Sequence, residues 1–423
     1  MRRVLITGIG LITPLGVGAA ATWKALLEGR SAIGPVRGFD ASSLRTRLAA
    51  EIDGLPVGDL VPTPRMRRTM TRPDVLALGA ATLALRDAGI ELTEEEAERA
   101  ALFVGGNKEI SDPSDLLEAT LAARDGDGRV DMRRFGATAS SRVHPLFFIQ
   151  GLQAASLFYI SQTHGLKGAN TYFAGGAESG AFAIARGYRA VRRGEADVAL
   201  AGGFDDAVSW WNMSKLDGLG MMSASNDRGP EACRPYDRER DGTVLGEGAA
   251  FLVLEDAERA RRRGARVFGE LAGCGTGFDG RQLVTPDPEG AAISRAIDSA
   301  LAEAGVPAEQ IGYVAAHGSG TRLGDASEAR ALARAFDGRR PRASSVKPAT
   351  GHLVAAAGAL NVAVAALAVA ESAVPPLLHL ADMDPACQGA DWVTAAEEVP
   401  VGSALALARG VEGQCVALEV DSA

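Results

Sequence analysis

The sequence predicts an α/β protein with a substantially parallel sheet, and three observations lead to this fold class. Strand-like runs of β-branched and apolar residues alternate with Ala-, Leu- and Arg-rich segments of helical spacing. The 423 residues include no low-complexity linker, and 47% are apolar against 23% charged, an ordinary balance for a globular protein. The second part of the chain repeats the alternation of the first, so two similar halves meeting near residue 258 are expected.

The first half is expected to begin with a strand over residues 2–10. Residues 71–92 predict a helix, because apolar residues recur at helical spacing and Gly89 stands near its end. The other expected elements are strands at 101–106, 170–176 and 196–207, helices at 114–126 and 179–195, and a strand coupled to a helix within 247–265.

The second half is expected to repeat this pattern and to close on a strand. Its expected elements are a strand at 265–279, helices at 289–306, 325–338 and 353–370, strands leading into loops at 311–321 and 341–352, and a last strand at 413–420.

Two apolar stretches resemble membrane or export segments, and both have a better interpretation. Residues 353–370 carry no charge, but they are Ala-rich and follow a Gly-His pair, which favours a helix buried inside a large α/β protein. Residues 1–22 contain Thr, Gly and Pro and alternate like a strand entering a loop, which argues against a signal peptide. No membrane partner is therefore expected.

Charge and cysteine usage exclude several function classes. The net charge is −9 and no basic cluster is evident, so nucleic acid is not an expected partner. The histidines are scattered without HxxxH spacing, so no metal site is expected. The four cysteines form no CxxC pair, which is typical of reduced thiols in a cytoplasmic protein; they are Cys233, Cys274, Cys387 and Cys415.

Residues 170–191 predict a strand, a Gly-rich turn and an amphipathic helix, an arrangement on which many α/β enzymes mount a nucleophile. The turn contains no Cys, and Ser179 lacks the flanking pattern of a hydrolase. The stretches GIGLITPLG and GCGTGFDG lack the spacing of a dinucleotide loop or the Lys of a phosphate loop, so neither indicates a nucleotide site.

Polar clusters follow two other predicted strands, in AAHGSGTRLGD and SSVKPATGHL. Each holds one His beside Gly, where the backbone can approach a ligand closely. Either His alone could be a loop residue with satisfied hydrogen bonds. Together with Lys347 and Glu328, however, His317 and His352 form a possible site in which two imidazoles donate hydrogen bonds to a carbonyl.

Four longer motifs carry a family resemblance: RRVLITGIGLITPLG with TWKALLEGRSAI, RPYDRERDGTVLGEGAAFLVLE, AAHGSGTRLGDASEA and SSVKPATGHLVAAAGA. Over nearly its whole length the chain resembles the β-ketoacyl-carrier-protein synthases, condensing enzymes of the thiolase fold. The resemblance implies two duplicated αβα halves, at 1–258 and 259–423, that form a five-layer αβαβα architecture.

The chain departs from that family at the nucleophile. The family's Cys corresponds to Ala177, and a methyl group cannot form a thioester, so acyl-enzyme chemistry is excluded there. Ser179 lies further into the helix and should face elsewhere. A laboratory Cys→Ala exchange is not favoured, because the neighbours of Ala177 and a distant loop have diverged too.

That distant loop is the family's Phe-Gly-Phe-Gly-Gly-Thr-Asn segment, which gates the pocket and donates an N–H to the oxyanion. Here it reads Arg-Gly-Val-Glu-Gly-Gln-Cys at 409–415, so both Phe residues are missing. Val411 and Glu412 alter the gate, and the Glu412 carboxylate has the wrong sign for a site where negative charge develops.

Together the two losses resemble the chain-length factor, the inactive partner of a Cys-bearing ketosynthase in type II polyketide systems. The resemblance implies a heterodimer in which this chain shapes the acyl tunnel, while acyl groups arrive on the phosphopantetheine arm of an acyl carrier protein and no cofactor is bound. The tunnel floor is expected within 107–148, although ordinary packing would explain each residue equally; the candidates are Leu116, Leu117, Phe135, Phe147 and Phe148.

A second hypothesis is a malonyl-carrier-protein decarboxylase that makes a starter unit, and an inert scaffold or another enzyme also stays open. His317, Lys347 and His352 remain, and in the family they assist decarboxylation and hold the thioester carbonyl; they could equally remain because they support the fold. Glu412 and the missing Phe gate argue against decarboxylation. Docking of the carrier protein on Arg65, Arg67 and Arg68 is an expectation weighed against ordinary solvation.

Overall fold

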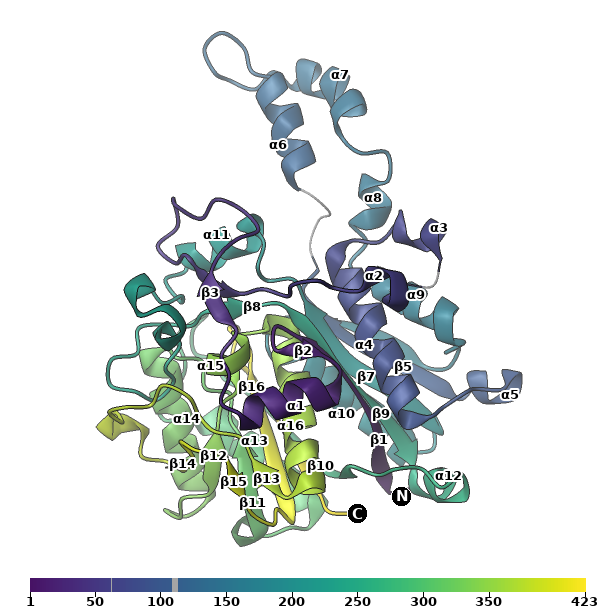
Figure 1. The fold of residues 1–423 in the computed structure, drawn as a ribbon, viewed down its shortest axis with the longest axis vertical. Coiled ribbons are helices and arrows are strands. Elements are labelled where there is room, and N and C mark those ends of the chain that lie inside the picture. The colour runs from purple at the N-terminus through teal and green to yellow at the C-terminus, as the bar shows by residue number, and fades with distance from the viewer. Residues whose placement is uncertain (62, 109–112) are drawn as a thin grey trace.

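The computed structural model of the protein describes residues 1–61, 63–108 and 113–423, and a twisted sheet runs through its centre (Figure 1). The strand order is β14-β12-β11-β16-β17-β10-β1-β9-β7-β5-β6, with β2 paired to β1. These strands are β1 Val4–Thr13, β2 Gly16–Val17, β5 Ala100–Gly106, β6 Asn170–Ala174, β7 Val198–Asp205, β9 Gly248–Asp256, β10 Gly269–Phe278, β11 Ile311–Ala315, β12 Arg342–Ser344, β14 Asp391–Trp392, β16 Ser403–Arg409 and β17 Gln414–Asp421.

The sheet is parallel on its flanks and antiparallel in its middle. Strand β5 pairs in parallel with β6 and β7, and β11 pairs in parallel with β12 and β16. The central pairings, from β7–β9 through β1–β10 to β16–β17, are antiparallel. The prediction of a substantially parallel sheet is therefore wrong in the middle. Strands β16 and β17 show the reason, because a short hairpin turn joins them without the helical crossover that parallel strands need.

The same strand order occurs twice. Each set contains five strands, and their order across the sheet is the first, last, fourth, second and third strand of the set along the chain. These orders are β1-β9-β7-β5-β6 and β10-β17-β16-β11-β12. The two sets join through β1 and β10, whose register pairs Leu5 with Glu270 and Ile6 with Gly269. The expected division near residue 258 would fall within α12 (Ala257–Arg262), between the two sets.

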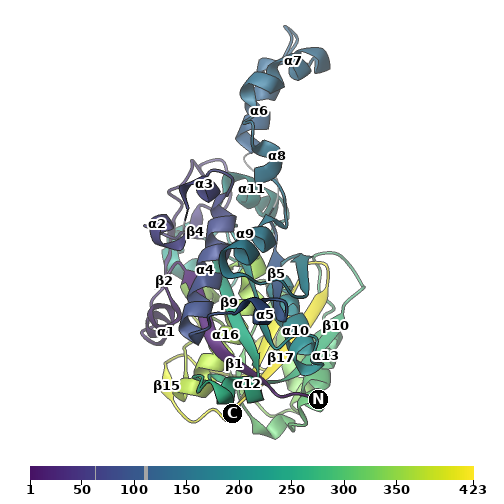
Figure 2. The same cartoon turned by 90° about the vertical axis from the view of Figure 1, so that its right-hand side faces the viewer.

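Helices and sheet form the five layers of the expected thiolase-like architecture (Figures 1 and 2). Helices α4 (Arg72–Ala88) and α9 (Ala155–His164) pack their apolar residues on one side of the first set. Helices α13 (Ala291–Ala304) and α14 (Arg322–Ala335) do so on the second set. The central layer consists of α10 (Ser179–Arg192) and α16 (Ala357–Glu371), whose side chains share one core with both sets.

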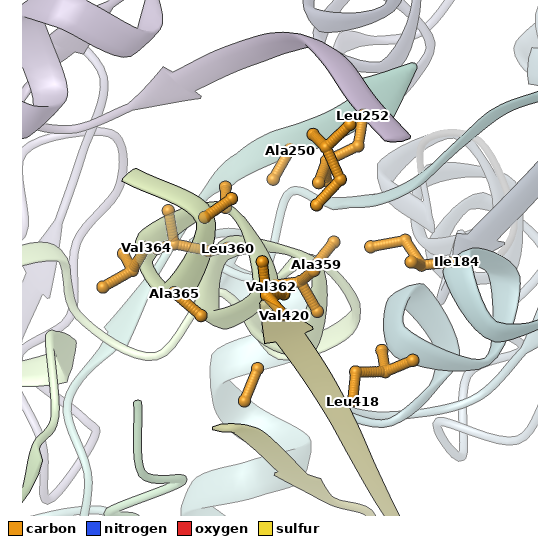
Figure 3. Close-up of a cluster of buried hydrophobic side chains, with 14 of the residues drawn as sticks. Ile184, Ala250, Leu252, Ala359, Leu360, Val362, Val364, Ala365, Leu418 and Val420 are labelled. Carbon is orange, nitrogen blue, oxygen red and sulfur yellow. The ribbon is translucent and has the colours of Figure 1, made fainter. Parts of the chain in front are cut away.

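Helix α16 is the apolar segment for which the sequence predicted burial. The stretch Val354–Glu371 has a mean hydropathy of 1.8, enough to cross a membrane by length and composition, yet 83% of it is buried inside the protein. Leu360, Val362 and Val364 pack among side chains of β9, α10 and β17 (Figure 3). The prediction of an internal helix is confirmed.

Local sequence signals account for the ends of several helices. At the start of helix α4, the Asp74 carboxylate accepts hydrogen bonds from the N–H and the hydroxyl of Thr71, and the helix ends at Gly89 in the left-handed conformation (φ 61°). The shorter elements are α1 Ala19–Leu27, α2 Val57–Leu60, α3 Pro64–Arg67, α5 Glu94–Ala97, α11 Trp210–Gly218, α15 Lys347–Thr350, β3 Ile33–Pro35, β4 Leu48–Ala50, β8 Leu245–Gly246, β13 Ala373–Val374 and β15 Glu397–Glu398.

An arm of helices projects from the body of the protein (Figures 1 and 2). It contains α6 (Pro113–Ala122) and α7 (Met132–Arg142), and α8 (Phe147–Gln150) leads back to the body. The arm and its base expose large apolar side chains, including Leu117, Leu121, Met132, Phe148, Ile149, Leu152 and Phe158. Exposed apolar groups gathered on one segment are typical of a surface that binds another protein.

Candidate functional site

The predicted strand–turn–helix is present between β6 and α10. The chain leaves β6 at Ala174, turns through Gly175 and Gly176, and enters α10 at Ser179. Ala177 is 4% exposed, and its carbonyl accepts a hydrogen bond of 3.0 Å from the N–H of Gly358 at the start of α16. A Cβ at Gly358 would collide with that carbonyl, so glycine is needed for this close approach.

Ser179 does not replace the missing nucleophile. Its hydroxyl donates a 2.9 Å hydrogen bond to the carbonyl of Gly176, within the turn itself. The side chain is buried and does not line the neighbouring cavity. The only side chain that the turn offers to the cavity at this point is the methyl group of Ala177.

Five of the predicted site residues line one cavity of about 530 Å³. They come from four separate segments of the sequence, and they are Ala177, His317, His352, Val411 and Glu412. Glu328 and Lys347 are buried behind this wall. The structure therefore brings the degenerate elbow, the two histidine loops and the altered gate loop together.

Glu328 on α14 holds the backbone of the His317 loop. Its carboxylate accepts hydrogen bonds from the N–H of His317 (2.7 Å), the N–H of Gly318 (2.8 Å) and the hydroxyl of Tyr236 (2.8 Å). The Lys347 ammonium donates to the carbonyl of His317. Burial lowers the pKa of Lys347 to about 8.

The imidazole rings of His317 and His352 meet edge to face in the cavity wall, with ring centroids 5.6 Å apart. Nδ1 of His352 accepts a 3.0 Å hydrogen bond from the N–H of Val354, so the neutral ring carries its proton on Nε2. Burial lowers the pKa of both histidines well below the ordinary value, and the Lys347 charge adds to this. Both rings are therefore neutral near pH 7, and the His352 Nε2–H is available as a donor.

Asn361 links two sides of the site, and the sequence did not predict it as a site residue. Its side-chain amide on α16 donates to the carbonyls of Ala316 (3.1 Å) and Leu407 (2.8 Å). It thereby fixes the end of β11, just before His317, to β16, just before the gate loop. The available signal was a single polar residue within an otherwise apolar helix.

The gate loop is the tight hairpin between β16 and β17. Gly410 and Gln414 close it with a 2.8 Å hydrogen bond, and the carbonyl of Val411 accepts from Val284 N–H at 2.8 Å. The Nη2 atom of Arg409 lies 3.5 Å from Oδ2 of Asp279. Both Val411 and Glu412 border the cavity, and the effect of the Glu412 carboxylate on an oxyanion stays a prediction.

Two buried carboxyl groups beside the elbow were also missed. Glu178, immediately before α10, is 2% exposed, and burial together with the Glu412 charge raises its pKa. Asp205, at the end of β7, lines the cavity and accepts from the Ala355 N–H at 3.2 Å; burial, with Asp206 adding, raises its pKa to about 8. An acidic residue directly after the nucleophile position was a visible signal for Glu178.

The expected tunnel and docking residues lie away from this cavity. Leu116 and Leu117 are on α6, Phe135 on α7, and Phe147 and Phe148 on α8, and none of them lines the cavity. Residues 109–112 of the expected floor segment lie outside the described part of the chain.

The three arginines proposed for docking gather on and after α3. The guanidinium of Arg67 donates to the carbonyls of Val61 and Gly58, which gives it a structural role. Arg65 and Arg68 are exposed, and the carbonyl of Arg68 accepts from the Gln150 amide at the base of the arm. Docking at these residues stays a prediction.

Comparison with known proteins identifies relatives over nearly the whole chain. One is a putative polyketide beta-ketoacyl synthase 1 of Streptomyces halstedii, 36% identical over 97% of this chain and 96% of the relative. Another is the tetracenomycin polyketide synthase ketoacyl synthase alpha subunit of Streptomyces glaucescens, 34% identical over 97% and 95%. A 3-oxoacyl-[acyl-carrier-protein] synthase 2 of Coxiella burnetii is 32% identical over 91% and 90%.

Solved structures give the same assignment. A beta-ketoacyl synthase from Burkholderia phymatum superposes with a TM-score of 0.88 at 31% identity, and both chains are fully covered. The ishigamide ketosynthase/chain length factor superposes with a TM-score of 0.86 at 29% identity, covering 100% of this chain and 99% of the other. Residues 1–260 match the family described as Beta-ketoacyl synthase, N-terminal domain, and residues 268–381 match Beta-ketoacyl synthase, C-terminal domain. The chain therefore belongs to the β-ketoacyl synthase family and has its thiolase-type fold.

Proposed function

We propose that this chain is a chain-length factor, the non-catalytic partner of a Cys-bearing ketosynthase in a type II polyketide or fatty-acid-like synthase. The observation that carries the proposal is Ala177, which stands at the cavity end of an intact elbow. Without a nucleophile the chain cannot hold an acyl group as a thioester, so condensation needs a cysteine from another subunit.

The surface of the protein supports a partner subunit. Strand β6 ends the sheet with mostly exposed or half-buried residues, and its unpaired edge is free to add another strand. On the projecting arm and its base, Met132 is 71% exposed and Phe148 is 77% exposed. Apolar side chains gathered on an exposed segment favour a surface that another protein covers. The likeness to the ishigamide ketosynthase/chain length factor also supports a heterodimer.

In this proposal the chain shapes the tunnel from the dimer interface. Side chains of the arm set the floor of the partner's acyl tunnel, with Leu116, Leu117, Phe135, Phe147 and Phe148 as the candidates. A large side chain stops the growing chain early and a small one lets it lengthen. Acyl groups arrive on the phosphopantetheine arm of an acyl carrier protein in the cytoplasm, and this chain supplies no cofactor.

The alternative function is decarboxylation of malonyl-carrier protein, and the retained histidine geometry favours it. Loss of CO₂ from a malonyl thioester leaves an enolate, whose oxygen the His352 Nε2–H and the His317 ring could stabilise before a proton from water completes the acetyl group. The carboxyl groups of Glu178 and Glu412 oppose both the malonyl carboxylate and the developing enolate. The chain-length factor is therefore the better supported function.

Mass spectrometry of malonyl-carrier protein incubated with this chain alone separates the two functions. The proposal predicts that the malonyl group stays intact, in the same amount as with the His317→Ala and His352→Ala variants. Conversion to acetyl-carrier protein that both substitutions abolish would contradict the proposal and establish the decarboxylase.

A further inference from the structure

We infer that Glu178 disables the elbow independently of Ala177, because its buried carboxyl group lies in the turn before α10, beside the position where a reactive thiolate would form. The inference rests on the proposed function only in taking position 177 as that of the lost nucleophile. It adds that restoring cysteine there would not by itself restore a reactive thiol.

The Glu178 side chain is folded back into the elbow. It is 2% exposed, and its Oε1 accepts a 3.1 Å hydrogen bond from the N–H of Gly176. Its Oε2 is buried and has no hydrogen-bond partner among the described residues. A Cβ at Gly410 would collide with this carboxyl group, so the group lies directly between the elbow and the gate loop.

The carboxyl group lies in the turn that leads into α10, next to the helix end that normally activates a thiol. Helix α10 has 14 residues, and the partial positive charge at its N-terminus favours an anion within the first turn. At such a position the pKa of a cysteine is lowered, which makes it nucleophilic at neutral pH. Here Glu178 is the residue immediately before the helix, but its side chain makes no capping hydrogen bond to α10. Its carboxyl group turns back to the Gly176 N–H and so lies beside the place where a thiolate at position 177 would form.

The other ionisable groups around the elbow do not offset this effect. Glu412 brings a second carboxylate from the gate loop, and Asp205 a third carboxyl group from the end of β7. The His317 and His352 rings are neutral near pH 7, because burial lowers their pKa. The described cavity wall also contributes the cations Lys215, Arg322 and Arg409, and the Arg409 guanidinium lies 3.5 Å from the Asp279 carboxylate.

The order of ionisation gives the sign of the effect. The ordinary pKa values of a Glu carboxyl and a Cys thiol differ by about four units. Burial and Glu412 raise the pKa of Glu178, and burial in the same turn would raise the pKa of a thiol at position 177 as well. A thiolate at position 177 would therefore form beside an existing carboxylate, and like charge raises its pKa.

The test is the pH dependence of alkylation by iodoacetamide in the full-length Ala177→Cys protein. All four native cysteines are buried, so labelling of the folded protein reports on the introduced thiol, and peptide mass spectrometry locates the label. We expect slow labelling at pH 7 in Ala177→Cys. Adding Glu178→Gln should lower the apparent pKa of the thiol by about one unit, which is about tenfold in rate at pH 7.

Three further variants make the result specific. Ala177→Cys with Glu195→Gln removes one negative charge near the far end of α10 and should label like Ala177→Cys alone. Ala177→Cys with Glu178→Thr, a shorter side chain, should label as fast as the Glu178→Gln double variant. Labelling of the unsubstituted chain should stay at background, and thermal unfolding verifies that each variant is folded.

Equal pH profiles for Ala177→Cys with and without Glu178→Gln, in folded proteins, would overturn the inference. A profile that shifts equally with Glu195→Gln would also overturn it, because the effect would then be one of net charge. Neither result depends on whether the chain sets product length or decarboxylates malonyl groups, so this inference and the proposed function fail separately.

Discussion

The histidine side and the elbow side of the cavity differ in how their side chains are bonded to the rest of the protein. On the histidine side, Glu328 holds the loop through three hydrogen bonds, and Asn361 ties the end of β11 to β16. On the elbow side, Ala177 contributes a methyl group, and the side chain of Glu412 is exposed. The histidine side thus serves the fold as well as any chemistry. Retained histidines are therefore weak evidence for catalysis, whereas the side chain at position 177 bears directly on whether an acyl group can be held.

The largest expected effect follows from Glu328→Leu. The substitution leaves the N–H groups of His317 and Gly318 and the hydroxyl of Tyr236 without their buried acceptor. We expect a loss of about 3 kcal/mol or more in the free energy of unfolding, measured with urea. Glu258→Gln, at an exposed position on α12, serves as the control and should change it little. A loss below about 1 kcal/mol for Glu328→Leu would mean that the histidine side is not structural.

Asn361→Leu tests the second support on the same side. Two buried carbonyls, of Ala316 and Leu407, lose their donor, and the expected cost is about 2 kcal/mol. Glu371→Gln near the end of the same helix removes only an exposed ion pair with Arg266 and should cost under about 0.5 kcal/mol. Equal losses of unfolding free energy in the two variants would show that the two hydrogen bonds of Asn361 do not stabilise the protein.

Asp205 should make stability depend on pH. Its pKa is raised from 3.8 to about 8 in the folded protein, so the folded state holds a proton that the unfolded state has released. Stability should therefore fall as pH rises from about 4 to about 8, by at most about 1.4 kcal/mol per pH unit from this group. Asp205→Asn should flatten the profile in urea unfolding at several pH values. An unchanged slope would show that Asp205 is ionised in the folded protein.

The smallest effect is expected at the gate loop on the elbow side. Glu412 is exposed, so Glu412→Gln should change the free energy of unfolding by less than about 0.5 kcal/mol. The same urea titration measures it beside Glu328→Leu. A loss comparable to that of Glu328→Leu would break the contrast between the two sides.

The sequence predicted local elements well because their signals are local. The helix expected at 71–92 is α4, whose capping residues are visible in the sequence, and the apolar runs at 2–10 and 353–370 are β1 and α16. The antiparallel centre of the sheet was not predictable in this way. Pairings such as β1 with β9 join strands far apart in the sequence, with Val4 opposite Asp256 and Ile12 opposite Ala249, and alternation along the chain carries no information about their direction.

Site residues that belong to a sequence motif could be predicted. Site residues whose properties come from burial could not. The motifs located Ala177, His317 and His352, which the fold brings to one cavity. The properties of Glu178 and Asp205 follow from the burial of their carboxyl groups beside that cavity, which the sequence does not show. Burial of this kind depends on contacts among distant segments, such as Gly410 against Glu178.

The most direct test of the central claim is a condensation assay with malonyl-carrier protein and a Cys-bearing ketosynthase from the same organism. The account predicts products only when both chains are present. Their length should change with Phe148→Ala on the arm and stay constant with Val17→Ala, a partly exposed residue of β2. The account would be contradicted if the ketosynthase alone gave the same products, or if this chain alone converted malonyl-carrier protein to its acetyl form.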